Sequence, residues 1–262
     1  MRIGLTLPSF VDDPDVPLAI ATAADEAGLD GVFVYDHLWR DRPPPRRPAL
    51  ECTVLLGAVA AETARITIGT LVARATLRPP AVLAHALGTA QRVSGGRLIA
   101  GIGSGDSESR LENEAFGLLF GTMADRVAAL HDAVRACHGN GYPVWVGGRA
   151  TQVREIVALA DGWNAWGGDA ARFAEQAAFV RDVAPDAEIT WGGLVALAAT
   201  DDAAHDKARA RDASAEVLVG SPASVSKQLR AWEDAGASWA ILGPLDASNP
   251  DNVPLIAEIV RR

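Results

Sequence analysis

The sequence predicts an α/β protein, a single (β/α)₈ TIM barrel, from its length, its composition and its alternation of strand and helix patterns. Its 262 residues are close to the roughly 250 that this barrel typically requires. Hydrophobic residues make up 49% of the chain and charged residues 22%, a balance that provides a buried core and excludes a disordered chain. Short β-rich runs alternate with longer helical patterns, as in parallel sheets with helical crossovers. No linker divides residues 1–262, so we expect one domain, with an open doubly wound sheet as the alternative.

The first half of the chain supplies four of the expected strands. Gly28 ends the first helix, and Pro79 opens the third, where a proline at the first helical position removes no useful donor. A proline-rich stretch, Arg42–Pro48, is expected to form an exposed loop. The expected strands are Arg2–Leu7, Gly31–Tyr35, Ile66–Val72 and Arg97–Ile102, with helices over Val16–Ala27, over Leu50–Glu62 and from Pro79 onward.

The second half repeats the same rhythm. Eight strands in strict alternation with helices fit a closed barrel. Only residues 138–143 connect the fourth helix to the fifth strand, a short connection. The expected strands are Val144–Val146, Trp163–Trp166, Ile189–Leu197 and Trp239–Leu242, and the helices are Met123–Cys137, Thr151–Ala160, Ala171–Ala184, Asp201–Ala215, Pro222–Ala235 and Val253–Val260.

Charge and cysteine content exclude several classes of function. The formal net charge of −9 and the pI near 5.0 argue against a nucleic-acid binder, which would carry a basic face. Cys52 and Cys137 cannot build a disulfide framework and form no CxxC pair. No metal-binding motif is present, so we expect no metal. The chain opens without a signal-peptide pattern, and no apolar run reaches about 18 residues, so we expect a soluble, cytoplasmic protein that binds no membrane.

The glycine-rich turns after the fourth and fifth strands are candidate binding sites, because active sites of such barrels lie at the carboxyl ends of the strands. Gly101–Gly105 would let a flat ring or a phosphate approach the backbone, although its spacing is not a dinucleotide fingerprint. Gly147–Thr151 leads into an expected helix, whose N–H groups and dipole favour a phosphate, and Arg149 adds positive charge. The alternative is that these glycines only make tight turns.

Asp36 and His37 follow the second strand and are the strongest candidates for chemistry. A histidine there can exchange a proton near neutral pH. Asp106, Glu112 or Glu114 could supply a carboxylate, although we favour a solvated helix face for the two glutamates. The remaining histidines and both cysteines lie on or beside expected helices, which favours structural roles: His85, His131, His138, His205, Cys52 and Cys137.

The chain contains seven tryptophans, and most of them are expected in the barrel core. Five fall in or next to strands: Trp145, Trp163, Trp166, Trp191 and Trp239. Trp39, in the loop after His37, is expected to line the substrate pocket, together with Ser9 after the first strand.

Short segments along nearly the whole chain resemble, in the same order, those of the bacterial luciferase-like flavin and deazaflavin oxidoreductases. Each segment alone is weakly specific, but the ordered set is specific for the family and not for a substrate. The segments are Gly28–His37, Ile68–Val72, Arg78–Ala81, Ser94–Leu98, Gly101–Asp106, Glu112–Gly117, Val144–Gly148 and Ala160–Trp163.

The resemblance implies a barrel that holds FMN or the deazaflavin coenzyme F420 over the strand ends. His37 would face the reacting carbon, and the Asp106 carboxylate would donate or accept a proton. Members with FMN often carry an arginine where this chain has Ser104, so the resemblance favours coenzyme F420, and it also implies a homodimer. It further implies a cis peptide between Leu71 and Val72. The residues expected at the cofactor are Asp36, Leu71, Val72, Gly103, Ser104, Gly105, Gly147, Gly148, Arg149, Ala150 and Thr151.

The short connection at residues 138–143 departs from the family pattern. Relatives usually carry a long insertion there that walls the substrate pocket. We therefore expect a pocket that is open, or that is closed by another chain or by Arg40–Pro48. The expected function is hydride transfer between coenzyme F420 and a small organic substrate. The alternatives are an FMN-dependent monooxygenase, a cofactor-binding barrel with little turnover, and a non-redox barrel of the sugar-phosphate isomerase kind.

Overall fold

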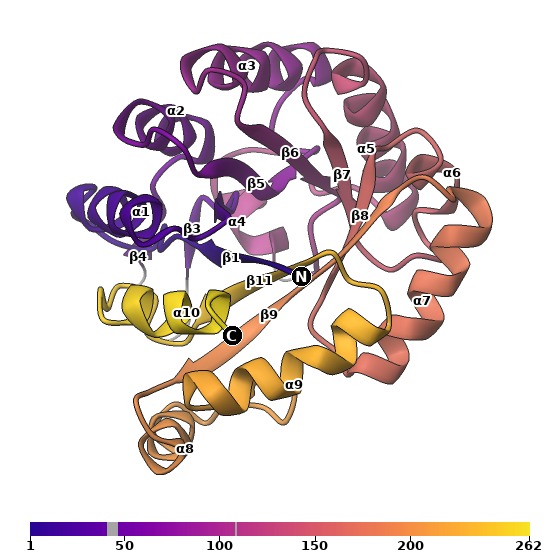
Figure 1. Cartoon of the computed structure of the whole chain (residues 1–262). Coiled ribbons are helices and arrows are strands. Elements are labelled where there is room, and N and C mark those ends of the chain that lie inside the picture. Colours follow the sequence, from indigo (N-terminus) through magenta and orange to yellow (C-terminus); the bar gives the residue numbers. More distant parts are fainter. Residues whose placement is uncertain (41–46, 108) are drawn as a thin grey trace.

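A closed barrel of parallel strands forms the centre of the molecule (Figure 1). The structure is a computed structural model and describes residues 1–40, 47–107 and 109–262. Pairing of β1 with β11 and of β8 with β9 closes the ring, which confirms the barrel over the open sheet. The barrel strands are β1 (Arg2–Thr6), β2 (Gly31–Val34), β5 (Thr67–Arg74), β6 (Leu98–Gly103), β7 (Val144–Gly147), β8 (Gly162–Trp166), β9 (Glu188–Leu197) and β11 (Trp239–Pro244).

Helices surround the barrel, largely where the sequence pattern predicts them (Figure 1). Gly28, at φ +80°, ends α1, a conformation that glycine adopts without strain. Thr122 and Asp125 form a reciprocal capping box at the start of α5. The helices around the strands are α1 (Asp15–Ala27), α2 (Cys52–Glu62), α3 (Pro80–Val93), α5 (Met123–Cys137), α6 (Arg154–Val157), α7 (Ala170–Val183), α8 (Asp201–Ala210), α9 (Pro222–Asp234) and α10 (Asn252–Val260).

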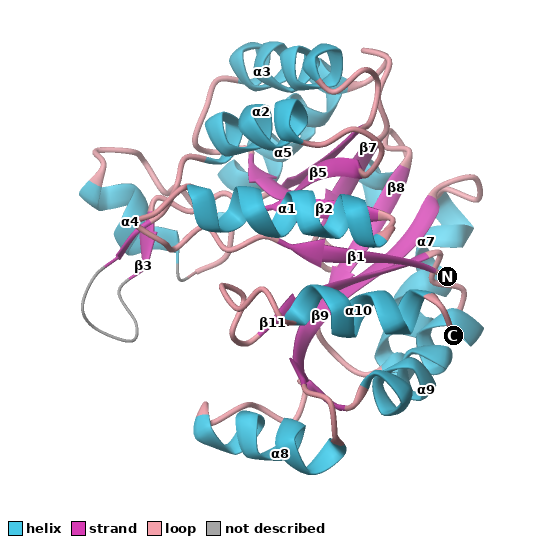
Figure 2. Cartoon of the chain, turned by 60° about the vertical axis from the view of Figure 1, so that its left-hand side comes forward, coloured by secondary structure: helices cyan, strands magenta, loops and turns pink. Residues whose placement is uncertain are grey.

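Four short elements were not expected from the sequence. The strands β3 (Trp39–Arg40) and β4 (Arg47–Pro48) pair antiparallel, so Arg47 and Pro48 are not loop. Helix α4 (Ser109–Ala115) follows β6, and β10 (Leu218–Gly220) pairs with the end of β9. Figure 2 shows β3 and α4 at the end of the barrel opposite the chain termini. The rest of the expected Arg42–Pro48 loop lies outside the described residues.

Two expected helices are shorter than predicted. The pattern at Thr151–Ala160 gives only the four residues of α6, flanked by turns. The pattern at Asp201–Ala215 ends at Ala210, and Asp212 adopts φ +46°, which a continuing right-handed helix does not allow.

Aromatic rings fill the interior of the barrel. Phe33, Trp145 and Trp239 lie with ring centroids 5.8–5.9 Å apart, and Leu71, Ile99 and Ile241 pack around them. Glycine makes the space: a Cβ on Gly69 would lie 2.7 Å from the ring of Phe33. The barrel is therefore a packed core and not a pore.

The expectation of core tryptophans is confirmed for four of the five strand positions. Trp145, Trp163, Trp191 and Trp239 are at most 1% exposed. Trp166, the last residue of β8, is 50% exposed instead. A strand end carries its side chain beyond the packed layers, so the alternating pattern no longer predicts burial there.

Both cysteines pack in the core, as expected from their helical positions. Cys52 and Cys137 are free thiols, and burial raises the pKa of each. Within residues 1–40, 47–107 and 109–262, no helix combines the length and the apolar character needed to cross a membrane.

Candidate active site

The turns singled out in the sequence meet at one rim of the barrel. Arg74 at the end of β5 is paired with Gly103 of β6, and Gly103 is paired with Gly147 of β7. Asp36, just after β2, accepts a hydrogen bond of 2.9 Å from the backbone N–H of Arg74. The turns that hold Asp36, Ser104 and Gly148 are therefore neighbours at the carboxyl ends of the strands, as a shared site requires.

Val72 occupies the space that two of these glycines leave. The Leu71–Val72 peptide bond is cis, as the family resemblance implies. A Cβ on Gly103 would lie 2.5 Å from Val72 Cγ2, and a Cβ on Gly147 would lie 2.6 Å from Val72 Cγ1. Larger residues at either position would displace Val72. These two glycines are the last residues of β6 and β7, and they allow a close approach within the protein.

Apolar side chains are exposed on the other half of the rim. Trp166, the last residue of β8, and Leu194, in the second half of β9, are 50% and 42% exposed. A Cβ on Gly243 of β11 would lie 3.3 Å from Leu194 Cδ2 and 3.4 Å from Trp166 Cη2, so both side chains reach the same point. Exposed apolar surface grouped in this way is typical of a binding site.

Trp166, and not Trp39, is therefore the tryptophan exposed at the rim. Trp39 is 8% exposed, and its backbone N–H donates to Glu112 at 3.4 Å. The apolar ring of Trp166 by itself predicts a core position. The one sequence signal for exposure is its place as the final residue of a strand.

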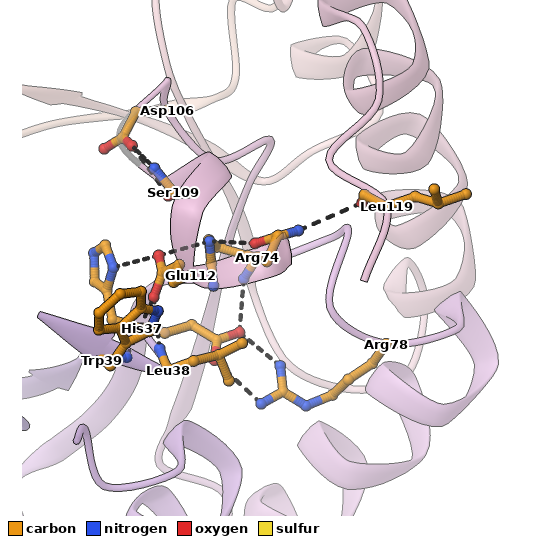
Figure 3. Close-up of polar contacts among 11 residues, drawn as sticks. His37, Leu38, Trp39, Arg74, Arg78, Asp106, Ser109, Glu112 and Leu119 are labelled. Carbon is orange, nitrogen blue, oxygen red and sulfur yellow. Dashed lines mark hydrogen bonds and ion pairs between the residues drawn. The ribbon is translucent and has the colours of Figure 1, made fainter. Parts of the chain in front are cut away.

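His37 forms a close pair with Glu112 (Figure 3). The His37 Nδ1 lies 2.9 Å from Glu112 Oε1, and the His37 side chain is 33% exposed. Glu112 Oε2 accepts the backbone N–H of Leu38 at 2.7 Å. Helix α4 thus brings a carboxylate against the strongest candidate for chemistry.

The expectation of a solvated face is wrong for Glu112 and correct for Glu114. Glu112 is 4% exposed, whereas the Glu114 side chain is 55% exposed. Burial alone would raise the pKa of the Glu112 carboxyl, but His37, the Leu38 N–H and the charge of Arg74 together hold this pKa below its usual value. Glu112 is therefore an ionised, buried carboxylate at neutral pH.

Two arginines complete a buried network of charges. Arg74 Nη1 lies 2.9 Å from Glu112 Oε1, while Arg78 donates to both oxygens of Asp36 at 2.6 and 3.1 Å and also contacts Glu51. Burial lowers the pKa of Arg78, but Asp36 and Glu51 outweigh this and raise it. Within the part of the chain that the structure describes, the Nε and Nη2 of Arg74 are buried without a hydrogen-bond partner.

Asp106 does not contact His37 or Glu112 through any hydrogen bond among the described residues, but it holds the start of α4. Its exposed carboxylate accepts the backbone N–H and the hydroxyl of Ser109, each at 3.0 Å, at the start of α4. Ser104 is half-buried, and a Cβ on Gly105 (φ +73°) would lie 3.4 Å from the Cδ of Arg74. Gly105 therefore lies against the buried Arg74, and Asp106 holds the helix that carries Glu112.

The expected phosphate turn differs from its prediction. Its helix begins at Arg154 and not at Thr151, so a helix dipole does not act on the turn. The N–H of Gly148 donates to Asn164 at 3.4 Å, and that of Ala150 donates to Gln176 at 3.2 Å. The backbone N–H groups of Arg149 and Thr151, both exposed residues, have no acceptor among the residues that the structure describes.

Ser9 is closed to a substrate. It is fully buried, its N–H donates to Tyr35 Oη at 3.0 Å, and its hydroxyl has no partner among the described residues. Phe10 and Tyr35 lie beside the candidate histidine, with ring centroids 5.5 and 5.9 Å from that of His37. These two partly exposed aromatic rings, and not Ser9, therefore lie beside His37, where the sequence predicts a substrate pocket lined by Ser9.

Comparison with curated proteins gives several relatives that share one description. An F420-dependent glucose-6-phosphate dehydrogenase of Nakamurella multipartita is 36% identical over 154 residues, which cover 58% of this chain and 42% of that protein. A protein of the same description from Kineococcus radiotolerans is 42% identical over 118 residues, 44% of this chain and 33% of that protein. The matches thus span less than half the length of these relatives.

Solved structures share the fold at low sequence identity. An F420-dependent secondary alcohol dehydrogenase in complex with an F420-acetone adduct has a TM-score of 0.80 at 14% identity, covering 99% of this chain and 98% of that chain. An EDTA monooxygenase from Chelativorans has a TM-score of 0.81 at 13% identity, covering 100% and 93%. A family model described as luciferase-like monooxygenase matches residues 1–141, more than half of the sequence. The chain therefore belongs to the luciferase-like monooxygenase family.

Proposed function

We propose that this protein is an oxidoreductase that transfers a hydride between coenzyme F420 and a small organic substrate. The observation that carries the proposal is the His37–Glu112 pair, in which an imidazole able to exchange protons contacts a buried carboxylate. The pair lies at the rim that also exposes apolar surface. The F420-dependent dehydrogenases among the relatives of this chain support the choice of cofactor.

The rim fits a flat ring that carries a phosphorylated tail. Trp166, Leu194 and the half-buried Val72 offer apolar surface that a planar ring would cover. The N–H groups of Arg149 and Thr151, with the Arg149 side chain, suit a phosphate. The residues that we assign to the cofactor are Leu71, Val72, Gly103, Ser104, Gly105, Gly147, Gly148, Arg149, Ala150 and Thr151.

Each polar group at the rim receives a distinct task. When bound, the deazaflavin supplies the hydride chemistry, and the protein supplies positioning and electrostatics. The His37 ring exchanges a proton with the substrate, and the exposed Asp106 is the second proton-exchanging candidate. Asp36 is 1% exposed and held by Arg78 and the Arg74 N–H, so it supports the cofactor site indirectly. Phe10 and Tyr35 flank the substrate.

The assembly and location of the protein belong to the same proposal. We infer one catalytic domain over residues 1–262, paired with a second copy. The free thiols of Cys52 and Cys137 suit a reducing compartment such as the cytoplasm. Sedimentation analysis of the purified protein tests the dimer.

Titration of the purified protein with coenzyme F420 and with FMN, followed by fluorescence, tests the function. We expect tighter binding of coenzyme F420, and a spectral change of the bound cofactor with a panel of small alcohols and sugar phosphates. Tighter binding of FMN with oxygen consumption would favour the monooxygenase. Binding of coenzyme F420 without turnover of any substrate would favour a cofactor-binding barrel with little turnover.

A further inference from the structure

We propose that Glu112 is a positioning residue that keeps the His37 proton on Nδ1, so that Nε2 is the nitrogen that exchanges a proton with the substrate. The catalytic consequence rests on the proposed function, whereas the position of the proton is a property of the protein alone. Neither part follows from the sequence, where Glu112 looks like a surface residue.

The donors around Glu112 decide which nitrogen carries the proton. An ionised carboxylate only accepts hydrogen bonds, so the 2.9 Å contact with His37 Nδ1 requires a proton on that nitrogen. In the neutral ring, Nε2 is then unprotonated and able to accept a proton. The opposite tautomer would place two lone pairs against each other at the same distance.

Glu112 has no freedom to turn away from this contact. Its Oε1 also faces Arg74 Nη1 at 2.9 Å, and its Oε2 accepts the N–H groups of Leu38 and Trp39 at 2.7 and 3.4 Å. At 4% exposure, almost no water competes for either oxygen. Two chain segments, residues 37–39 and the end of β5, therefore fix the acceptor before any ligand arrives.

Helix α4 is itself held at both ends, which fixes the position of the carboxylate. Asp106 accepts two hydrogen bonds from Ser109 at its start. Asn113, next to Glu112 and fully buried, accepts from Arg74 at 3.0 Å and donates to the Leu119 carbonyl at 3.4 Å. The short helix is thus tied to the rim by side chains and not by its own length.

The plane of the imidazole is constrained as well. The rings of Phe10 and Tyr35 meet it at interplanar angles of 46° and 69°. Glu112 holds Nδ1, and the rings of Phe10 and Tyr35 pack beside the imidazole. The protein therefore sets the direction in which Nε2 points. Pre-organisation of this kind is what an orienting carboxylate provides in catalytic pairs.

Nitrogen NMR of histidine-labelled, cofactor-free protein tests the proposal directly. At an alkaline pH where histidine rings are neutral, about pH 9, we expect His37 to carry its proton on Nδ1 and none on Nε2. The His37→Gln variant identifies the His37 signals. A wild-type protein with the proton mainly on Nε2 would overturn the proposal, whatever any variant does.

Glu112→Gln then tests the positioning role. Every group around the carboxylate donates, so a glutamine must turn its NH₂ either toward His37 or toward the Leu38 N–H. We expect a mixture of His37 tautomers and a fall of kcat by about tenfold or more, with the affinity for coenzyme F420 unchanged. Glu114→Gln, on the same helix but exposed, should change neither.

The outcomes separate this inference from the proposed function. A protein with the proton on Nδ1 that binds no coenzyme F420 would disprove the function and leave the tautomer assignment standing. A protein that turns over with coenzyme F420, but whose tautomer and kcat are both unaffected by Glu112→Gln, would disprove the positioning role alone. If Glu112→Gln does not fold, the wild-type NMR measurement still decides the assignment.

Discussion

The two ends of the barrel use their carboxylates differently. At the N-terminal end of the strands, Asp25 accepts the backbone N–H groups of residues 64–66, which lead into β5. Asp161 accepts the first N–H of β7 at 2.8 Å. At the C-terminal end, Asp36 and Glu112 are held mainly by the side chains of arginines and His37.

This difference separates stability from function. Backbone groups at the start of a strand must find partners when buried, so the carboxylates at the N-terminal end stabilise the fold. Buried ion pairs add little net stability, because desolvation offsets their attraction. Oriented charges at the C-terminal end are instead the arrangement that acid–base chemistry requires. Substitutions at the two ends should therefore affect different measurements.

Removal of the candidate proton-exchanging group should have the largest effect. His37→Ala should slow turnover with coenzyme F420 by about 100-fold or more, because the rim would then lack its imidazole. Cofactor affinity should stay within about threefold, and Tm should fall less than in Asp25→Ala, because Arg74 and the Leu38 N–H still hold Glu112. Steady-state kinetics, cofactor titration and thermal unfolding measure the three quantities. Unchanged turnover would remove His37 from the mechanism.

Loss of the Asp25 carboxylate should give the converse result. Asp25→Ala leaves three backbone N–H groups without their acceptor and should lower the free energy of unfolding by about 2 kcal/mol. For a protein of this size Tm should fall by about 5 °C, with kcat unchanged. Asp12→Ala, at an exposed position before α1, is the control. An equal Tm for the two variants would contradict the comparison.

A glycine of the proposed phosphate turn should show a smaller, ligand-dependent effect. Gly148 has φ +134°, which valine adopts poorly, and its Cβ would lie 3.5 Å from Val153 Cγ1. Gly148→Val should weaken binding of coenzyme F420 by about tenfold. Gly139→Val, at φ +79° in the connection from α5 to β7, should lower Tm without weakening binding. Equal cofactor affinity in the Gly148→Val protein would place the phosphate elsewhere.

The smallest expected effect is a difference in how Tm depends on acid pH between the wild-type protein and Asp25→Ala. Burial raises the pKa of Asp25, but N–H groups of residues 64–66 outweigh it, so its folded pKa lies below the unfolded value, as does that of Glu112. Their stabilisation is present above about pH 4.5 and is lost as pH falls through the folded values. Thermal unfolding should show a falling Tm below about pH 4.5, with a shallower fall in Asp25→Ala. Parallel curves would contradict this assignment.

The barrel could be predicted because its strands are long enough to show a pattern. Glycines and prolines mark the ends of most elements, and several boundaries differ by only one or two residues, as at Gly28 and Pro79. The strands β3, β4 and β10 and the helix α4 contain too few residues for periodicity to appear. Their existence depends on contacts with the finished barrel.

The site could be predicted only where its residues follow a strand directly. Asp36 and His37 could be found because active sites lie at strand ends. Glu112 and Glu114 have the same local pattern, and only the packing of α4 over Arg74 turns one inward. Trp166 was expected in the core because alternation does not reveal which strand residue rises above the packed interior.

The acceptor beside His37 is carried by the segment between β6 and α5, which is not part of the barrel wall. Residues 104–107 and 109–122 belong to the connection from the end of β6 to the start of α5, and Asp106 and Glu112 both lie on this connection. Replacing this connection with a different segment between β6 and α5 would change the proton chemistry and leave the strand ends of the site intact. New reactivity in this scaffold, whether selected or engineered, can arise from one surface segment without altering any strand.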